Sequence, residues 1–459
     1  MLDLEEFRNK KIHFIGICGH SMCGLAEILK NWGYRNITGS DRTDSDEIGR
    51  LNSLGIKASV GHDENNVKDA ALVVYTAAIP KDNPERSYAE THGIPCIDRA
   101  ALLGMISARC RRCIAVSGSH GKTTTTGMTA EIFRLLGMEP TIHVGGVLPS
   151  IGSGVYTGGR EYFITEACEY VDSFLSLRPH TAVILNIDSD HLDYFKTEEN
   201  IYRSFMKFAS YVPDDGHVVG CYDDEKTRRL MSECGRPTVS YGMSPDADYH
   251  PENVAYGSDG CPSYDLYRGD GFVAHVELSV IGEANLLDSM AAMISAMLEG
   301  VPAADAARAL KKFGGASQRF DYKGSFNGAR IYTDYAHHPG EVQALIKAAG
   351  HIEKNRLWVV YEPLHYSRTK AQFDRFVDCF AGADKVIFIK IFGDREPFDP
   401  TISSGMVADA IVKKHGTDCR YIPEMKDCGE YLKKHLEPGD IVLIMCGGNR
   451  EPLEKRILE

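Results

Sequence analysis

A strand–helix alternation that restarts three times constrains the fold of this chain more than any other feature. Short runs rich in β-branched residues alternate with helical stretches through the 459 residues, which is typical of α/β domains with parallel sheets. The pattern restarts at Lys11, at Ile114 and, after Gly314-Gly315, near Phe320. A chain of this length exceeds what one compact core normally holds. We therefore expect three α/β domains.

The individual elements follow from apolar runs and from helical spacing of apolar residues. Strands are predicted at Ile12–Ile17, Leu72–Tyr75, Ile114–Ser117, Ala182–Asn186, Arg356–Tyr361, Lys385–Ile389 and Asp440–Met445. Helices are predicted at Met22–Trp32, Thr124–Leu136, Ala291–Leu298, Ala304–Lys312 and Gly340–Ala349. Between Tyr241 and Leu278, short alternating runs separated by Gly, Asp and Pro turns indicate a small antiparallel patch inside the middle domain.

Charge and cysteine usage exclude several classes of protein. The formal net charge is −13 with no long basic run, which argues against a nucleic-acid partner. The acidic N-terminus is unlike a signal peptide, and no apolar run of 18 residues predicts a membrane span. Thirteen scattered cysteines fit reduced thiols in the cytoplasm. Cys110 and Cys113 form a lone CxxC, which we interpret as free thiols rather than a zinc or redox site.

A glycine-rich turn in the middle block joins an apolar strand to a helix. Its sequence is a short GxxGKTT, because Val116 stands where the usual phosphate loop begins with glycine. Freed backbone N–H groups at a helix start bind phosphate oxygens, the lysine reaches the β- and γ-phosphates, and the next hydroxyl binds Mg²⁺. The predicted ATP-binding residues are Gly118, Ser119, His120, Gly121, Lys122, Thr123 and Thr124.

Polar clusters follow two further strands of the same block. Glu166-Ala-Cys-Glu169 follows one strand, and Asn186-Ile-Asp-Ser-Asp-His191-Leu-Asp193 follows the next. The carboxyl ends of parallel strands meet at one edge of a sheet, so both clusters should lie beside the phosphate loop. Carboxylates and hydroxyls suit a hard cation in ATP chemistry. A turn or helix cap is the alternative interpretation of the Asp-His pair.

The first block opens with a second glycine turn between a strand and a helix. It contains Gly16, Gly19 and Gly24, and Asp41 ends the next strand. The arrangement resembles a Rossmann-type nucleotide site, although Cys18 breaks the GxGxxG pattern. The turn Thr76-Ala77-Ala78-Ile79 follows another strand of this block and could approach a diphosphate. A nucleotide substrate fits better than NAD, because an oxidoreductase would not need the ATP apparatus that follows.

The third block carries a histidine pair and an arginine after successive strands. His337 and His338 lie between Asp334 and a predicted helix, and Arg368 follows the next strand. An arginine there can hold a carboxylate bidentately, as an amino-acid substrate requires. A turn with a helix cap and a lone surface arginine are the respective alternatives.

Taken in order, these motifs resemble the Mur ligase family across essentially the whole chain. The resemblance rests on GICGHSMCGLAEIL, YTAAIPKDNPE, SGSHGKTTTT, TEACEYVDSFL, NIDSDHLDYF, QRFDYKGSFNG and DYAHHPGEV. It implies a Rossmann-like UDP-sugar domain over residues 1–109 and a P-loop ATPase-type domain over 110–319, with a mostly parallel sheet. A Rossmann-like domain over 320–459 would bind the amino acid and close the site.

The resemblance also implies an activity and residue roles. The enzyme would use ATP and Mg²⁺ to add an amino acid, L-alanine, to the lactyl carboxylate of UDP-N-acetylmuramate through an acyl phosphate, in peptidoglycan precursor synthesis. The expected UDP-sugar contacts are Gly16, Gly19, Gly24, Asp41, Thr76, Ala77, Ala78 and Ile79. The expected metal ligands are Thr123, Glu166 and His191, with Asn186 nearby, and the expected further ATP contacts are Asn285, Arg319, Asp334 and His338. Lys122 would absorb phosphate charge and Arg368 would hold the amino acid, while His191, His337 and His338 are candidates for the base.

The chain departs from the usual family pattern at three places. Ala284 and Asp288 stand where His and Asn are usual near adenine, and Leu364-His365 and Asn449 lie around the amino-acid pocket. A relative with another acceptor or UDP-sugar, and a non-catalytic nucleotide-sugar-binding regulator, are the alternatives. A nicotinamide dehydrogenase is more distant. The sequence leaves open the acceptor, and whether the protein is a monomer or a homodimer.

Overall fold

The computed structural model describes residues 2–189, 191–393, 396–446 and 453–459. The chain divides into two compact units. The first unit comprises Met1–Pro251, Leu266–Ala274 and Leu287–Leu310, and the second comprises Glu252–Asp265, His275–Leu286 and Lys311–Glu459. None of the described helices is long and apolar enough to span a membrane.

The N-terminal domain is an open sheet of five parallel strands in the order β3-β2-β1-β4-β5. The strands are β1 (Lys11–Ile15), β2 (Asn36–Asp41), β3 (Lys57–Val60), β4 (Leu72–Tyr75) and β5 (Cys96–Asp98). The helices are α1 (His20–Asn31), α2 (Asp46–Ser53), α3 (Pro84–Thr91) and α4 (Arg99–Ser107), with short 3₁₀ turns at Leu4–Phe7 and Glu64–Asn66. The strand order reverses between β1 and β4, and ligands of such sheets bind at this switch point.

A fully buried carboxylate, Glu85 of α3, joins three parts of this domain. It accepts hydrogen bonds from Ser40 Oγ at 2.5 Å and from Asn66 Nδ2 at 2.6 Å, and His62 Nδ1 lies 3.2 Å away. Burial raises the pKa of the Glu85 carboxyl, but interactions with His13, Ser40 and Asn66 outweigh it and lower the pKa to about 2. The ionised carboxylate therefore stabilises the folded domain.

We expect Glu85→Gln to lower the free energy of unfolding at pH 7 by about 2–3 kcal/mol. Because the folded pKa lies below the unfolded value of about 4.3, the stabilisation is complete above about pH 5 and is lost as pH falls toward 2. Urea unfolding of both proteins between pH 3 and 7 measures this difference. A constant gap across that range would contradict the assignment.

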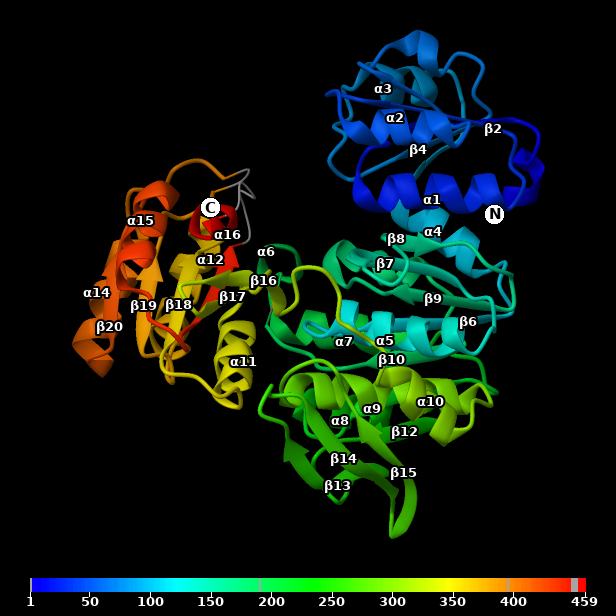
Figure 1. The fold of residues 1–459 in the computed structure, drawn as a ribbon. Helices are drawn as coiled ribbons and strands as arrows, with labels where there is room; N and C mark the ends of the chain where they lie inside the picture. The colour runs from blue at the N-terminus through cyan, green and yellow to red at the C-terminus, as the bar shows by residue number, and fades with distance from the viewer. Residues whose placement is uncertain (1, 190, 394–395, 447–452) are drawn as a thin grey trace. The chain divides into compact units, whose positions relative to one another are not determined.

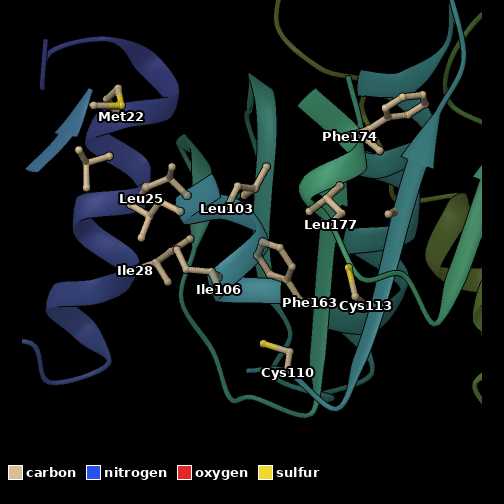
Figure 2. Close-up of a cluster of buried hydrophobic side chains, with 14 of the residues drawn as sticks. Met22, Leu25, Ile28, Leu103, Ile106, Cys110, Cys113, Phe163, Phe174 and Leu177 are labelled. Carbon is tan, nitrogen blue, oxygen red and sulfur yellow. The ribbon is translucent and has the colours of Figure 1, made fainter. Parts of the chain in front are cut away.

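Helices α1 and α4 pack on the central domain through an apolar cluster (Figure 2). The cluster includes Leu25, Leu103, Phe163 and Phe174, and the cysteines of the CxxC pair are buried in it (Figure 2). A Cβ added at Gly24 would lie 2.2 Å from Val155 Cγ2. The N-terminal and central domains therefore share this apolar cluster and pack against each other through it.

The central domain is built on one ten-stranded sheet in the order β15-β14-β13-β12-β11-β10-β6-β9-β7-β8 (Figure 1). Its strands are β6 (Arg112–Ser117), β7 (Thr141–Leu148), β8 (Ser153–Tyr156), β9 (Tyr162–Glu166), β10 (Thr181–Ile184), β11 (His217–Cys221), β12 (Thr238–Tyr241), β13 (Tyr249–Tyr256), β14 (Pro262–Arg268) and β15 (Gly271–Glu277). Strand β6 pairs in parallel with both β9 and β10. The short turns between β13, β14 and β15 allow only antiparallel pairing, as predicted for this patch.

The helices of this domain are α5 (Lys122–Leu135), α6 (Leu192–Phe195), α7 (Glu198–Ala209), α8 (Glu225–Glu233), α9 (Glu283–Leu298) and α10 (Ala303–Leu310), with a 3₁₀ segment η3 (Tyr170–Ser176). The boundaries of the predicted elements differ from the observed ones by two residues or fewer, except at the start of α9. Helix α9 begins at Glu283, eight residues before the predicted start. Strand β10 ends at Ile184, and Asn186 lies in the loop beyond it.

The C-terminal domain has a six-stranded sheet in the order β16-β17-β21-β18-β19-β20, parallel except at β16. The strands are β16 (Asp321–Phe326), β17 (Ala329–Asp334), β18 (Leu357–Glu362), β19 (Lys385–Phe388), β20 (Asp418–Tyr421) and β21 (Ile441–Cys446). The helices are α11 (Pro339–Gly350), α12 (Tyr366–Ala371), α13 (Phe373–Asp378), α14 (Ser404–His415), α15 (Met425–His435) and α16 (Leu453–Leu458).

Apolar cores cover both faces of this C-terminal sheet. Alternate residues of β18 enter two different clusters, with Val359 and Tyr361 in one and Trp358 and Val360 in the other. Period-two burial on both faces explains why β18 reads as a continuous apolar run. The three sheets confirm the predicted α/β class with mostly parallel strands, while the domain boundaries at 109/110 and 319/320 stay predictions.

Candidate active site

The predicted phosphate loop links β6 to α5 through two glycines with positive φ. Gly118 has φ +141° and Gly121, the residue before α5, has φ +86°. A Cβ on Gly121 would lie 2.6 Å from Asp288 Oδ1, and one on Gly118 would lie 2.9 Å from Leu185 Cβ. Only glycine satisfies both the backbone and the space here. The loop can therefore present its backbone N–H groups at the start of α5.

The loop is held in place by the segment after β10. Asn186 Oδ1 accepts from His120 N at 2.9 Å, and Asn186 Nδ2 donates to His120 O at 3.2 Å. Ser119 Oγ accepts from Asp188 N at 2.8 Å. Asn186 is thus a support of the loop backbone, and the predicted proximity of this segment to the loop is observed.

Lys122, the first residue of α5, is paired with Glu169. Its ammonium lies 3.0 Å from Glu169 Oε2 and donates to the carbonyl oxygens of Gly118 and Ser119 at 2.5 and 3.2 Å. Burial lowers the pKa of Lys122, but the charge and hydrogen bond of Glu169, together with the charges of Cys168 and Glu166, outweigh burial and raise the pKa above its ordinary value. Lys122 is therefore a cation held directly over the loop.

Glu169 belongs to the polar cluster that was expected beside the phosphate loop, but no individual role was predicted for it. It is 2% exposed, and its Oε1 lies 3.9 Å from His191 Nε2, so it faces both Lys122 and His191. The next residues are strained, because Val171 has φ +50° and Asp172 φ +57°. A β-branched residue in that region is a genuine outlier, and such strain gathers at functional sites. The Glu-x-x-Glu spacing was the only signal in the sequence.

Thr123 and Glu166 lie on either side of a glycine pair in β7. A Cβ on Gly145 would lie 2.8 Å from Glu166 Oε2, and one on Gly146 would lie 3.1 Å from Thr123 Cγ2. Glu166 also accepts from Gly145 N at 2.9 Å. Within the described part of the chain, the Thr123 hydroxyl has no hydrogen-bond partner. A hydroxyl and a carboxylate are thus available beside the lysine, which suits a hard cation.

The two predicted nucleotide-binding turns of the N-terminal domain lie together at its switch point. A Cβ on Gly16 would lie 2.9 Å from Thr76 Cγ2 and 3.6 Å from Ile79 Cδ1. Gly19 precedes α1, and Asp41 accepts from Cys18 N at 3.0 Å. Asp41 therefore holds the first turn.

Three other predicted UDP-sugar positions differ in their surroundings. Ala77 and Ala78 are exposed in the second turn, open to a ligand. Gly24 is buried in α1 against Val155, so the structure gives it a packing role, and a sugar contact there finds no structural support.

The predicted ATP contacts of the second unit all have local structural partners. Asn285 Nδ2 donates to Ile281 O at 2.8 Å, and the Arg319 guanidinium lies 5.8 Å from the Tyr335 ring centre. Asp334 accepts from Phe320 N and Ala336 N at 2.8 and 2.7 Å. Burial raises the pKa of the Asp334 carboxyl to about 6, against the opposing charge of Arg319. Asp334 thus fixes the chain beside Arg319.

The histidine pair of the second unit lies at the start of α11. His338 is the fully buried N-cap, whose Nδ1 accepts from Gly340 N at 3.4 Å, and Glu341 Oε2 accepts from the backbone N of His337 and His338. The helix cap, which is the alternative interpretation of this histidine pair, is therefore present.

The positions assigned to the amino-acid pocket lie after β18. Arg368 is half-buried in α12, and His365, which precedes that helix, has φ +70°. Asn449 lies outside the described residues. Asp288, the departure assigned to adenine, accepts from Thr125 Oγ1 at 2.9 Å and lies under Gly121. It supports the phosphate loop from α9.

The parallel sheet and the Gly-Lys-Thr loop at the start of α5 define a nucleotide-binding α/β protein of the phosphate-loop class. Three family models match the chain: "Mur ligase family, catalytic domain" at residues 11–111, "Mur ligase middle domain" at 116–296 and "Mur ligase, glutamate ligase domain" at 318–448. The chain belongs to the Mur ligase family.

Relatives agree with this membership, and two solved structures share the fold. The UDP-N-acetylmuramate–L-alanine ligase of Caldanaerobacter subterraneus is 44% identical over 100% of this chain and 99% of its own length. The ligase of the same name from Acetivibrio thermocellus is 40% identical, with 98% and 95% covered. The UDP-N-acetylmuramate–alanine ligase structure from Thermotoga maritima has a TM-score of 0.80 at 24% identity, covering 98% of each chain. A murein peptide ligase from Psychrobacter arcticus has a TM-score of 0.69 at 24% identity, again with 98% of each chain covered.

Proposed function

We propose that this chain is an ADP-forming ligase that joins L-alanine to the lactyl carboxylate of UDP-N-acetylmuramate, a step of peptidoglycan precursor synthesis. The choice of substrates rests on the full-length similarity to relatives named UDP-N-acetylmuramate–L-alanine ligase. The ATP requirement has independent support in the Lys122 loop, since a lysine at a helix start with freed backbone N–H groups suits a triphosphate.

The proposed reaction has two steps, and the positive charge of Lys122 assists the first. The lactyl carboxylate attacks the γ-phosphorus of ATP and ADP leaves, which gives an acyl phosphate; the alanine nitrogen then attacks the acyl carbon and inorganic phosphate leaves. Lys122 offsets the charge that develops on the phosphate oxygens. A base must take the proton of the amine, and His191, His337 and His338 are the candidates; His191 Nε2 lies 3.9 Å from Glu169 Oε1.

Mg²⁺ is part of the proposal because the donors fit it. Thr123 and Glu166 offer oxygen atoms on either side of Gly145-Gly146, and His191 adds an imidazole on the side of Glu169. When bound, Mg²⁺ neutralises phosphate charge. We place the protein in the cytoplasm, since all thirteen cysteines lie in the described part of the chain and are free.

The remaining roles are assigned by position. Turns Gly16–Gly19 and Thr76–Ile79 would hold the UDP-sugar diphosphate at the switch point. In the second unit, Asn285, Arg319 and Asp334 would contact ATP, and Arg368 would bind the carboxylate of the acceptor.

The acceptor is tested by ADP release with UDP-N-acetylmuramate against the twenty common amino acids. We expect the highest kcat/KM with L-alanine and negligible release without an amino acid. Because Leu364 and His365 depart from the usual pattern near this pocket, glycine and L-serine are the sharpest competitors. A higher kcat/KM for another amine would change the acceptor, and no ADP with any amine would contradict the ligase function.

A further inference from the structure

A small cavity of about 140 Å³ lies between the N-terminal and central domains of the first unit. Ser21 of α1, Arg99 of α4 and Glu166 of β9 form its polar side. Leu103, Phe174 and Leu177 form an apolar side, and Figure 2 shows these three side chains near one another. The cavity therefore adjoins both the Gly16–Gly19 turn, through α1, and the phosphate-loop site, through Glu166.

Arg99 brings a positive charge to this cavity without a protein counter-ion. Its Nη1 donates to Ser21 Oγ at 3.2 Å, and among the described residues no carboxylate lies within salt-bridge distance of its guanidinium. His143 adds no charge, because burial, followed by the charges of Arg99 and His20, lowers its pKa to about 3. His143 Nε2 instead lies 2.8 Å from Ser21 Oγ. An anionic ligand would supply the counter-ion that Arg99 lacks in the described part of the protein.

Size and polarity define the group that fits. A volume of about 140 Å³ is close to that of a cavity that holds one benzene molecule, about 150 Å³, so it excludes a nucleotide or a whole sugar. A guanidinium fork binds a carboxylate through two parallel hydrogen bonds. The apolar side suits a methyl group. The cavity therefore matches a short branched carboxylic acid.

Two components of the proposed reaction have this chemistry, the lactyl group of the UDP-sugar and L-alanine. Arg99 and Ser21 both belong to the domain that carries the nucleotide-sugar turns, and Ser21 lies two residues after Gly19. Glu166 faces the same cavity and would repel a carboxylate that no cation held. These positions favour the lactyl group, whose carboxylate must reach the phosphate loop.

We propose that this cavity is the lactyl subsite: Arg99 binds the lactyl carboxylate, and Leu103, Phe174 and Leu177 contact the lactyl methyl group. The proposal rests on the proposed function and adds a residue that selects the substrate. Arg99 thereby distinguishes UDP-N-acetylmuramate from UDP-N-acetylglucosamine, which has the same nucleotide and sugar ring without the lactyl group.

Calorimetric titration of both UDP-sugars tests this subsite in the full chain without turnover. We expect the wild-type protein to bind UDP-N-acetylmuramate more tightly than UDP-N-acetylglucosamine. Arg99→Gln should raise the Kd of the first by about 10- to 100-fold and that of the second by less than about threefold. For Arg99→Lys, the Kd of UDP-N-acetylmuramate should lie between those of the wild-type protein and Arg99→Gln, because lysine keeps the positive charge but cannot form two parallel hydrogen bonds. Arg111→Gln, at an exposed ion pair with Glu161, is the matched control and should change neither Kd.

Each other result has a definite meaning. A wild-type protein without preference for UDP-N-acetylmuramate contradicts the proposed function itself. A wild-type preference that survives in Arg99→Gln overturns the subsite alone, as does an equal loss for both sugars, which would indicate damage to the nucleotide site. If Arg99→Gln raises the KM for L-alanine and leaves the Kd for UDP-N-acetylmuramate unchanged, the cavity binds the amino acid and the lactyl assignment is overturned.

Discussion

Replacing Lys122 with alanine is expected to lower kcat by about 10³-fold or more. The ammonium is held over the loop by Gly118 O, Ser119 O and Glu169, so it meets a bound triphosphate without reorganisation. No other described lysine or arginine of this loop can replace it. Steady-state ADP release with saturating UDP-N-acetylmuramate and L-alanine measures the loss.

A matched control separates this effect from a general loss of charge or fold. Lys226→Ala removes an exposed lysine of the same domain, paired with Glu198 at 2.8 Å, and should keep activity within about twofold. Circular dichroism and UDP-sugar binding confirm that Lys122→Ala is folded. A folded Lys122→Ala protein with at least a tenth of wild-type kcat would refute the role of this lysine.

Glu169→Gln is expected to lower the free energy of unfolding of the ligand-free protein by about 3–5 kcal/mol. The substitution leaves the Lys122 ammonium in a buried position without its carboxylate, and burial alone disfavours that cation. Saturating MgATP should restore much of the loss, because phosphate oxygens become the new partner of Lys122. Denaturant unfolding of both proteins, with and without MgATP, measures the loss of stability and its recovery.

Two further variants make the Glu169 result specific. Glu161→Gln removes an exposed carboxylate that pairs with Arg111 and should change stability by less than about 1 kcal/mol. On a Lys122→Ala background, Glu169→Gln should cost little, because the ion pair is already broken. An equal cost on both backgrounds would mean that Glu169 acts independently of Lys122.

The convergence of the central motifs could be predicted because parallel strands place their carboxyl ends at one edge. The phosphate loop follows β6, and its neighbours in the sheet, β9 and β10, lead to Glu166 and Asn186. The same rule predicted that the turns containing Gly16 and Thr76 lie near each other, since β1 and β4 are neighbours. The proximity of motifs that follow neighbouring parallel strands could therefore be predicted from the sequence.

Contacts between residues far apart in the chain could not be read in this way. Glu169, which pairs with Lys122, is followed closely by positive φ angles at Val171 and Asp172, which no propensity indicates. Gly24 looked like part of a nucleotide turn, yet it faces Val155 across a domain junction. Arg99 had no motif at all, because its significance comes from a cavity whose sides are contributed by separate elements.

The route through an acyl phosphate is tested most directly by oxygen transfer. UDP-N-acetylmuramate labelled with ¹⁸O in its lactyl carboxylate is incubated with ATP, Mg²⁺ and L-alanine, and the released phosphate is analysed by mass spectrometry. Because the carboxylate oxygen that attacks phosphorus leaves with it, we expect one ¹⁸O atom in each inorganic phosphate. Phosphate without label, or label found in AMP, would contradict the activation of this carboxylate by the γ-phosphate of ATP.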